Sequence, residues 1–194
     1  SSDTSFTMLM AAISITDVNE FSVTTPIDAN ATANSVTENA VNGTVAGITA
    51  SAVDSDATTN TVTYSLVDDA SGRFAINLTT GVVTVAEGSL LNFEAATSHN
   101  ITIRVTSSDL STATQVMTIT LTDVNETPVS VTDTVTAVEA GGISNGTAGT
   151  NPLGNVLTND ADVDSGDTKA ITGVANGTQG SAAGSVASNV AGAY

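Results

Sequence analysis

Apolar and polar residues alternate along most of the chain. Apolar side chains recur at every second position over 62–66, 101–105 and 117–121, separated by Thr, Ser or Arg. A period of two predicts β-strands with one buried and one exposed face, and no stretch sustains the period of a helix. Clusters of Gly, Asn, Asp and Ser separate the predicted strands at 54–60, 68–72, 87–89 and 106–111. This spacing of turns predicts an all-β protein built as a Greek-key β-sandwich.

The sequence repeats itself at a fixed interval. Residues 1–5 recur as 107–111 and residues 15–20 recur as 121–126, with an offset of 106 residues in both cases (107 − 1 and 121 − 15). A period of this length is typical of β-sandwich domains in a tandem array. We therefore expect the last strand and linker of a preceding repeat, then a complete sandwich, then a partial second β domain. Their predicted bounds are 1–20, 21–124 and 125–194.

Composition excludes several classes of function. The chain has 3 Lys and Arg against 20 Asp and Glu, a formal net charge of −17, so that no basic patch can form to bind nucleic acid or an anionic membrane. No run of 18 apolar residues is present that would insert into a membrane. The chain has no Cys and a single His, which leaves little nucleophilic or general-base chemistry. We expect a non-enzymatic protein that binds cations.

The few aromatic and titratable side chains outside the acidic loops have structural interpretations. His99 precedes a predicted strand and is expected to be an exposed turn residue, with no catalytic partner. Tyr64, Phe74 and Phe93 are expected in the core rather than on a sugar-stacking surface.

Acidic and amide side chains gather at the two predicted ends of the sandwich. Carboxylates that converge without a cation repel one another. Oxygen ligands without His or Cys select Ca²⁺ over Zn²⁺, and ligands on separate loops suit Ca²⁺ better than Mg²⁺. The candidate ligands at one end are Asp17, Asn19, Glu20, Asp54, Asp56 and Asp109. Those at the other end are Glu38, Asn92, Glu94, Asp123, Asn125 and Glu126.

Several motifs over residues 24–128 resemble a cadherin repeat in their order along the chain. They are 36–40 (VTENA), 52–56 (AVDSD), 62–66 (VTYSL), 74–77 (FAIN) with 80–85 (TGVVTV), 91–94 (LNFE) and 123–128 (DVNETP). In cadherins an early Glu, the Leu-Asp-x-Glu loop and the interdomain linker share Ca²⁺ with the Asp-x-Asp motif of the next domain. The resemblance therefore implies that Glu38, Glu94, Asp123, Asn125 and Glu126 serve the second boundary. The resemblance assigns the remaining candidate ligands to the first boundary, namely Asp17, Asn19, Glu20, Asp54, Asp56 and Asp109.

Two residues depart from the cadherin pattern. Asn92 stands where the family usually has Asp, and Glu126 where animal members have the second Asp of the linker. The second site then has one fewer charge, so we expect it to bind Ca²⁺ more weakly.

The last part of the chain resembles a second family. Residues 154–167 (GNVLTNDADVDSGD), followed by 171–174 (ITGV), are similar to the start of a VCBS repeat. Such repeats occur in very large secreted bacterial proteins and adhesins, which implies a place on the bacterial cell surface or in the secreted fraction. Asp160, Asp162 and Asp164 are expected to complete the second site or to form one of their own.

These observations predict a Ca²⁺-rigidified structural or adhesive module of a large bacterial surface protein or fibre. Its partners would be neighbouring repeats of the same protein. One alternative is a Ca²⁺-dependent carbohydrate-binding module. Another is a filament subunit that assembles by strand exchange through residues 6–16, which have the apolar character of a final strand.

Overall fold

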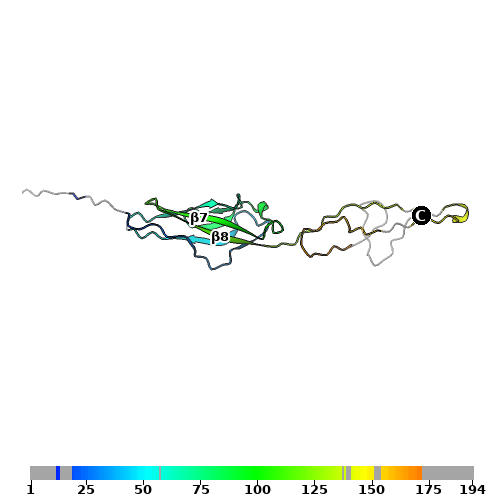
Figure 1. Ribbon diagram of the computed structural model, residues 1–194, viewed down its shortest axis with the longest axis horizontal. Helices are drawn as coiled ribbons and strands as arrows, with labels where there is room; N and C mark the ends of the chain where they lie inside the picture. The colour runs from blue at the N-terminus through cyan, green and yellow to red at the C-terminus, as the bar shows by residue number, and fades with distance from the viewer. Residues whose placement is uncertain are drawn as a thin grey trace, which may run out of the picture. The chain divides into compact units, whose positions relative to one another are not determined.

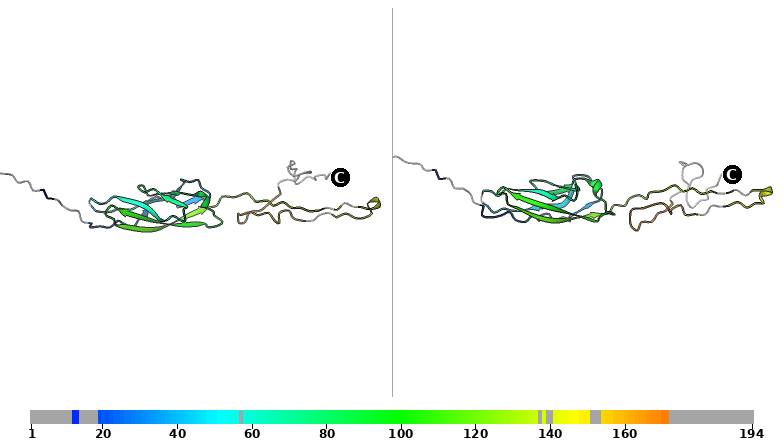
Figure 2. Two further views of the ribbon diagram at one scale, coloured as in Figure 1. Left: turned by 90° about the horizontal axis from the view of Figure 1, so that it is seen from above. Right: turned by 45° about the horizontal axis from the view of Figure 1, so that its top comes forward.

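The computed structural model describes residues 12–13, 19–56, 58–136, 138, 141–150 and 154–171. The chain divides into two compact units, 1–123 and 124–194, and each is described here by itself. In the first unit two four-stranded sheets lie face to face, as Figures 1 and 2 show. The predicted all-β class is therefore confirmed. Of the predicted strand 6–16, only Ala12 and Ile13 lie within the described residues.

The chain passes between the two sheets several times, from β1 to β5 at each step and again from β6 to β7, as in a sandwich. One sheet has the order β1-β3-β6-β5 and the other the order β2-β8-β7-β4. The first contains β1 (Ile27–Asp28), β3 (Val45–Ser51), β6 (Val82–Val85) and β5 (Phe74–Ile76). The second contains β2 (Ser35–Thr37), β8 (Thr112–Thr122), β7 (Ser98–Ser107) and β4 (Val62–Asp68). All pairs are antiparallel except β2 with β8, which is parallel.

The core lies between the two sheets and follows the predicted alternation. Ile101, Ile103 and Val105 on β7 are fully buried, as is Ile119 on β8. From the facing sheet Ile48, Phe74, Val83 and Val85 complete this layer. Each such side chain contributes about 1.5–3 kcal/mol when it is fully buried. Because the chain has no Cys, this burial must stabilise the sandwich without cross-links.

The sequence analysis expected His99 in an exposed turn, but His99 lies in a strand. The strand β7 begins at Ser98, so that His99 occupies an inward position of the same alternation as Ile101. Its imidazole is half-buried, and its ring centroid lies 6.4 Å from that of Phe74. The inward alternation of Ile101–Val105 therefore extends two residues toward the N-terminus, to a position that is not apolar.

The described part of the second unit is held by isolated β-bridges. Val129 pairs with Ala161, Val138 with Thr150, and Gly141 with Thr147, all antiparallel. A short 3-10 helix, η2 (Ile143–Asn145), joins the two arms of the last two bridges at their tip. The partial β domain over 125–194 stays a prediction.

Candidate cation-binding sites

Two groups of carboxylates converge in the structure. Asp54, Asp56 and Asp109 form the first cluster, and the second cluster consists of Glu38, Glu94, Asp123 and Glu126. Within each group, ligand oxygens lie within 4.8 Å of one another. All seven residues are among those that the sequence analysis selected.

The first cluster lies where two chain segments leave their strands. Asp54 and Asp56 follow β3, and Asp109 lies in the turn between β7 and β8. The exposed fractions of Asp54 and Asp56 are only 9% and 2%. The Asp56 backbone N–H donates to Oδ1 of Asp54 at 3.1 Å, and the Ala52 N–H donates to the Tyr64 hydroxyl at 3.1 Å. The segment that carries the two carboxylates is thus held against the sandwich.

The segment that enters the sandwich is bound to the same carboxylates. The backbone N–H groups of Glu20 and Phe21 both donate to Oδ1 of Asp56, at 3.1 Å each. The side-chain amide of Asn19 donates to Oδ2 of Asp109. The structure therefore brings Asn19 and Glu20 to the first cluster, while Asp17 lies outside the described residues.

Two oxygens of the first cluster are buried without a partner. Neither Oδ2 of Asp54 nor Oδ2 of Asp56 accepts a hydrogen bond within the described part of the chain. A buried carboxylate oxygen that has lost water and gained no donor is strongly destabilising unless a cation is near. This donor set, three carboxylates and no nitrogen or sulfur, fits a hard divalent cation such as Ca²⁺.

Asp109 is held in its charged form by local hydrogen bonds. Desolvation raises the pKa of Asp109, but the Ser111 backbone N–H and the Ser111 and Ser107 hydroxyls together outweigh it, so that this pKa lies below its usual value. Ser111 also accepts a hydrogen bond from the Val23 N–H through its hydroxyl, at 2.9 Å. The sequence analysis did not select Ser111. The Asp-x-Ser spacing of 109–111, which allows a side chain to accept from the backbone two residues on, was the available signal.

The second cluster is centred on a buried glutamate. Glu38 directly follows β2 and is only 2% exposed. Its backbone N–H donates to the Thr122 carbonyl at 3.1 Å, and its Oε2 accepts from the Phe93 N–H at 3.0 Å. Glu38 is therefore fixed between the end of β8 and the loop 91–94.

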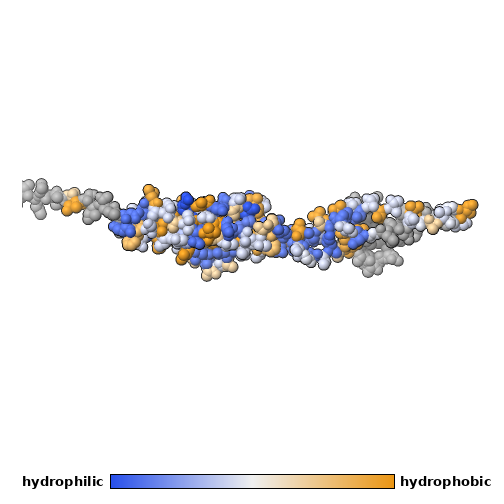
Figure 3. All heavy atoms as spheres, viewed as in Figure 1, coloured by the Kyte–Doolittle hydropathy of each residue, from blue (hydrophilic) through white to orange (hydrophobic). Residues whose placement is uncertain are grey.

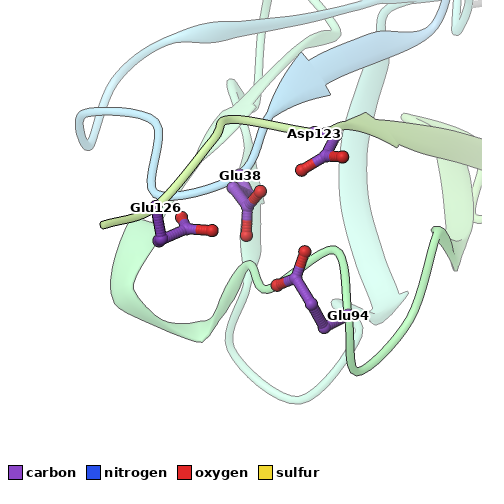
Figure 4. Close-up of side chains that lie close together, drawn as sticks. All are labelled: Glu38, Glu94, Asp123 and Glu126. Carbon is purple, nitrogen blue, oxygen red and sulfur yellow. The ribbon is translucent and has the colours of Figure 1, made fainter. Parts of the chain in front are cut away.

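The other three carboxylates approach Glu38 from two segments. Figure 4 shows all four carboxylates pointing toward one another. Glu94 comes from the loop 91–94, Asp123 directly follows β8, and Glu126 lies three residues beyond it. Glu94 and Asp123 are exposed, and Glu126 is half-buried.

Close packing of Gly88 holds the neighbouring loop near Glu38. This residue begins a 3-10 helix, η1 (Gly88–Leu90), and its N–H donates to Oδ1 of Asn42 at 2.8 Å. A Cβ at this position would lie 1.8 Å from the Ala40 carbonyl oxygen. Only glycine allows the two segments to approach so closely.

The two amide ligands predicted for the second cluster make local hydrogen bonds. Oδ1 of Asn92 accepts from the Ala95 N–H at 2.6 Å, which closes the loop that carries Glu94. The side-chain amide of Asn125 donates to the Glu126 carbonyl at 2.6 Å. Both residues therefore help to shape the chain beside the second cluster.

The second unit repeats the arrangement found around Asp56. The Glu126 N–H donates to Oδ2 of Asp164 at 2.7 Å, as the Glu20 N–H does to Asp56. The Asp164 N–H in turn donates to Oδ1 of Asp162 at 3.2 Å. Asp164 is 9% exposed, and its Oδ1 is buried without a partner in the described residues.

Asp160 has a different position in this unit. Its Oδ1 accepts from the Val131 N–H at 2.8 Å, and its backbone carbonyl accepts from the Lys169 ammonium group. Asp162 and Asp164 thus correspond to Asp54 and Asp56, whereas the Asp160 side chain holds the segment that contains Val131.

Comparison with known proteins identifies the family. A model of the cadherin domain matches residues 32–131, about half of the chain. The chain belongs to the cadherin domain family. Cadherin domains are extracellular adhesion modules that bind Ca²⁺, and the family is not enzymatic. No helix in the described ranges has the length and apolar character of a membrane span.

Solved cadherin structures are similar to this cadherin domain. Mouse cadherin-23 EC22-24 is 26% identical, with a TM-score of 0.49, over 60% of this chain and 38% of that one. Chicken VE-cadherin EC1-2 is 27% identical, with a TM-score of 0.42, over 56% and 54% of the two chains. Protocadherin gamma B2 domains 3-6 are 24% identical, with a TM-score of 0.48, over 63% and 30%. No curated protein matches the chain.

Proposed function

We propose that this cadherin domain is a structural and adhesive module that Ca²⁺ stiffens. The observation that carries the proposal is the pair of buried oxygens, Oδ2 of Asp54 and Oδ2 of Asp56, which converge with Asp109 and have no hydrogen-bond partner among the described residues. Negatively charged neighbours do not stabilise two such oxygens, whereas a divalent cation does.

The second cluster extends the proposal to the segment that leaves β8. Four carboxylates within 4.8 Å repel one another strongly when no cation is bound. One of them, Glu126, lies on that segment, so Ca²⁺ held by Glu38, Glu94, Asp123 and Glu126 would restrain it. Asp162 and Asp164 would supply further oxygens to cations at the start of the second unit.

The mechanism is electrostatic and mechanical. Without Ca²⁺ the repelling carboxylates would favour separation of the segments that carry them. With Ca²⁺ the same segments would be cross-linked through oxygen ligands. Extracellular modules of this type bind Ca²⁺ at about 10⁻⁴–10⁻³ M, so that millimolar external Ca²⁺ is sufficient. Folding and metal binding would then be coupled.

The finer setting is also a proposal. The likeness of residues 154–167 to a VCBS repeat supports a large bacterial surface protein or fibre, in which neighbouring repeats of the same protein are the partners. The repeat of residues 15–20 at 121–126 supports a tandem array.

Thermal unfolding of the full chain tests the proposal. We expect circular dichroism to show a higher Tm in a few millimolar CaCl₂ than in EDTA, with a much smaller effect of MgCl₂. Glu94→Gln should reduce the Ca²⁺ effect. Asp69→Asn removes the same charge from a turn that contributes to neither cluster, where Asp69 accepts from the Gly72 N–H, and should leave the effect unchanged. Equal Tm values in EDTA and CaCl₂ would reject a Ca²⁺-stiffened module.

A further inference from the structure

Residues 38–43 run alongside residues 85–93 in the opposite direction, and we call these two stretches the paired segments. Starting at the second cluster, the contacts between them are Oε2 of Glu38 with the Phe93 N–H (3.0 Å), the Asn39 N–H with the Leu91 carbonyl (3.1 Å), the close approach of Gly88 to the Ala40 carbonyl, Oδ1 of Asn42 with the Gly88 N–H (2.8 Å), and the Gly43 N–H with the Val85 carbonyl (2.8 Å). The row of contacts therefore begins at a carboxylate of the second cluster and ends at the dipeptide Asn42-Gly43.

The turn at the end of this row requires glycine after Asn42. The Thr44 N–H donates to the Val41 carbonyl at 3.0 Å across the turn, and φ at Gly43 is +92°. A side chain fits poorly at this φ, so the fold itself explains the glycine. The same requirement creates an Asn-Gly dipeptide. In such a dipeptide asparagine loses its side-chain amide most readily, because glycine has no Cβ to hinder ring closure.

The reaction of such a dipeptide is an intramolecular substitution followed by hydrolysis. The Gly43 nitrogen loses its proton to hydroxide and attacks Cγ of Asn42. The bond from Cγ to Nδ2 then breaks, and the amide nitrogen takes up a proton from solvent and leaves as ammonia. Water opens the resulting succinimide ring at either carbonyl, which gives aspartate or isoaspartate. The net change is the uptake of water and the loss of ammonia, so no enzyme or cofactor is needed.

Water and hydroxide can reach this turn. Hydrophilic and apolar residues are interspersed over the visible face of the sandwich (Figure 3), as is typical of a surface in contact with water. The four residues of the turn, 41–44, are all exposed. Solvent access therefore does not limit the reaction at Asn42.

Both reacting groups are instead restrained by the paired segments. The Gly43 N–H, which must lose its proton, donates to the Val85 carbonyl, and Oδ1 of Asn42 accepts from the Gly88 N–H. While both hydrogen bonds persist, neither group is free to rotate into the ring. The reaction therefore requires the paired segments to separate at this end, which is a local opening of the fold.

The second cluster lies at the other end of the same row of contacts. Its four carboxylates lie within 4.8 Å of one another and repel when no cation is bound. Because Glu38 begins the row, this repulsion acts directly on the paired segments. Loss of the first contact lowers the free energy needed to open the next one. We propose that Asn42 is a deamidation site that Ca²⁺ at the second cluster protects. The proposal rests on the proposed Ca²⁺-stiffened module and adds a covalent consequence of losing the ion.

Deamidation would make the opening permanent. The pKa of Glu87 lies below its usual value, because Ser89 and, to a smaller extent, Asn42 hydrogen-bond to its carboxylate and outweigh desolvation. Aspartate at position 42 would lose this donor and place a second negative charge beside Glu87. Isoaspartate would also lengthen the main chain by a methylene group within the paired segments. A domain that has been without Ca²⁺ would therefore bind it less tightly afterwards.

Peptide mapping of the full chain by mass spectrometry tests the proposal. The chain is incubated at mildly alkaline pH in EDTA, MgCl₂ or CaCl₂, and conversion of Asn42 is followed by the mass gained when NH₂ is replaced by OH. We expect the reaction to be roughly tenfold slower in CaCl₂ than in EDTA, which corresponds to about 1.4 kcal/mol in the free energy of opening. MgCl₂ should give nearly the rate found in EDTA. In urea, where the paired segments are absent, Ca²⁺ should have no effect.

Matched variants separate the second cluster from other effects of Ca²⁺. Glu94→Gln removes a carboxylate of the second cluster and should lose most of the protection at Asn42. Asp69→Asn, which changes neither cluster, should keep it. The dipeptide Asn145-Gly146 in the second unit is an internal comparison, because its Ca²⁺ dependence should be the same in the wild type and in Glu94→Gln.

A variant that mimics the product tests the consequence. Asn42→Asp should weaken the binding of Ca²⁺ at least threefold in isothermal titration. Asn77→Asp adds the same charge in a different turn, where its oxygen can still accept from the Thr79 and Thr80 N–H groups, and should leave the affinity unchanged.

Three results would overturn the proposal: equal rates at Asn42 in EDTA and CaCl₂, an unreactive Asn42 in EDTA although the chain in urea reacts, and full protection in Glu94→Gln. The Tm of the wild type in EDTA and in CaCl₂ is measured on the same samples. A normal rise of Tm in CaCl₂ with equal rates at Asn42 rejects only the deamidation site. A missing rise of Tm rejects the Ca²⁺-stiffened module on which it rests.

Discussion

At the scale of single residues, the two carboxylate oxygens of Asp56 have different roles. Its Oδ1 accepts from two backbone N–H groups of the segment that enters the sandwich, while its Oδ2 is buried beside the other carboxylates without a donor in the described part of the chain. The first oxygen favours the folded state in any medium. The second contributes only when a cation is present, and is destabilising otherwise.

The effect of Asp56→Asn on stability should therefore depend on whether Ca²⁺ is present. In EDTA the variant keeps the oxygen that accepts from Glu20 and Phe21 but loses a repelling charge, so its Tm should equal or exceed that of the wild type. In CaCl₂ it should be less stable than the wild type, by about 1–3 kcal/mol for a roughly 10–100-fold loss of affinity. Denaturant unfolding in both media measures this. A variant that is less stable in both media by the same amount would indicate a purely structural role.

His99 should make stability depend on pH. Burial lowers the pKa of His99, and the Arg73 guanidinium lowers it further. The unfolded chain then binds a proton at higher pH than the folded chain does. Stability due to this group is complete above the unfolded pKa of about 6.5 and is lost as the pH falls toward the lower folded value.

Denaturant unfolding between pH 7.5 and pH 5.5 measures this effect. We expect the free energy of unfolding to fall over this range for the wild type. His99→Gln, which cannot be protonated, should flatten the profile. If the wild type and the variant fall in parallel, the pH dependence comes from other groups.

At the scale of elements, close packing of η1 against the 38–42 segment holds the second cluster together. Gly88→Ala would place a methyl group 1.8 Å from the Ala40 carbonyl oxygen, so that one segment must move. We expect a loss of about 1–3 kcal/mol in the free energy of unfolding. The affinity of the second cluster for Ca²⁺ should fall as well, which isothermal titration would detect. Gly154→Ala, where no atom lies within 4 Å of the added Cβ and φ is outside the left-handed region, is the matched control for added volume.

The long strands and the short ones differ in how far the sequence predicts them. The strands β7 and β8 have enough alternating positions that Ile101–Val105 and 117–121 were predicted directly, and the inward apolar side chains of these two ranges are buried. The strand β2 has three residues and β1 has two, too few for a period to be visible. The period of two therefore predicted neither of these short strands.

The acidic residues of the candidate sites were predictable from the sequence, but the contacts that hold their loops in place were not. Asp54, Asp56, Glu38 and Glu94 stand in motifs whose spacing is visible in the sequence. The contact of Gly88 with Ala40 depends on two segments that are 48 residues apart (88 − 40). No local pattern reports such a contact.

At the scale of the whole molecule, the proposed Ca²⁺ sites predict a change in protease sensitivity. Glu126 lies both in the second cluster and on the segment that leaves β8. In EDTA, repulsion should free this segment, and a protease that cuts after Glu should cleave there. In CaCl₂ the cleavage should slow at least tenfold, and Glu94→Gln should lose that protection. Mass spectrometry of the fragments identifies the cut, and equal rates in both media would contradict the prediction.

The bond from the Glu20 backbone to Asp56 has a counterpart from Glu126 to Asp164. In each unit an Asp-x-Asp segment receives the chain that enters that unit through a backbone N–H, which is present whatever the side chain. The contact that holds the entering chain thus lies within each unit. If such units are repeated in tandem, duplication or loss of a whole unit would leave every remaining entry intact, so that the length of the protein could change by genetic recombination without changes at the remaining boundaries.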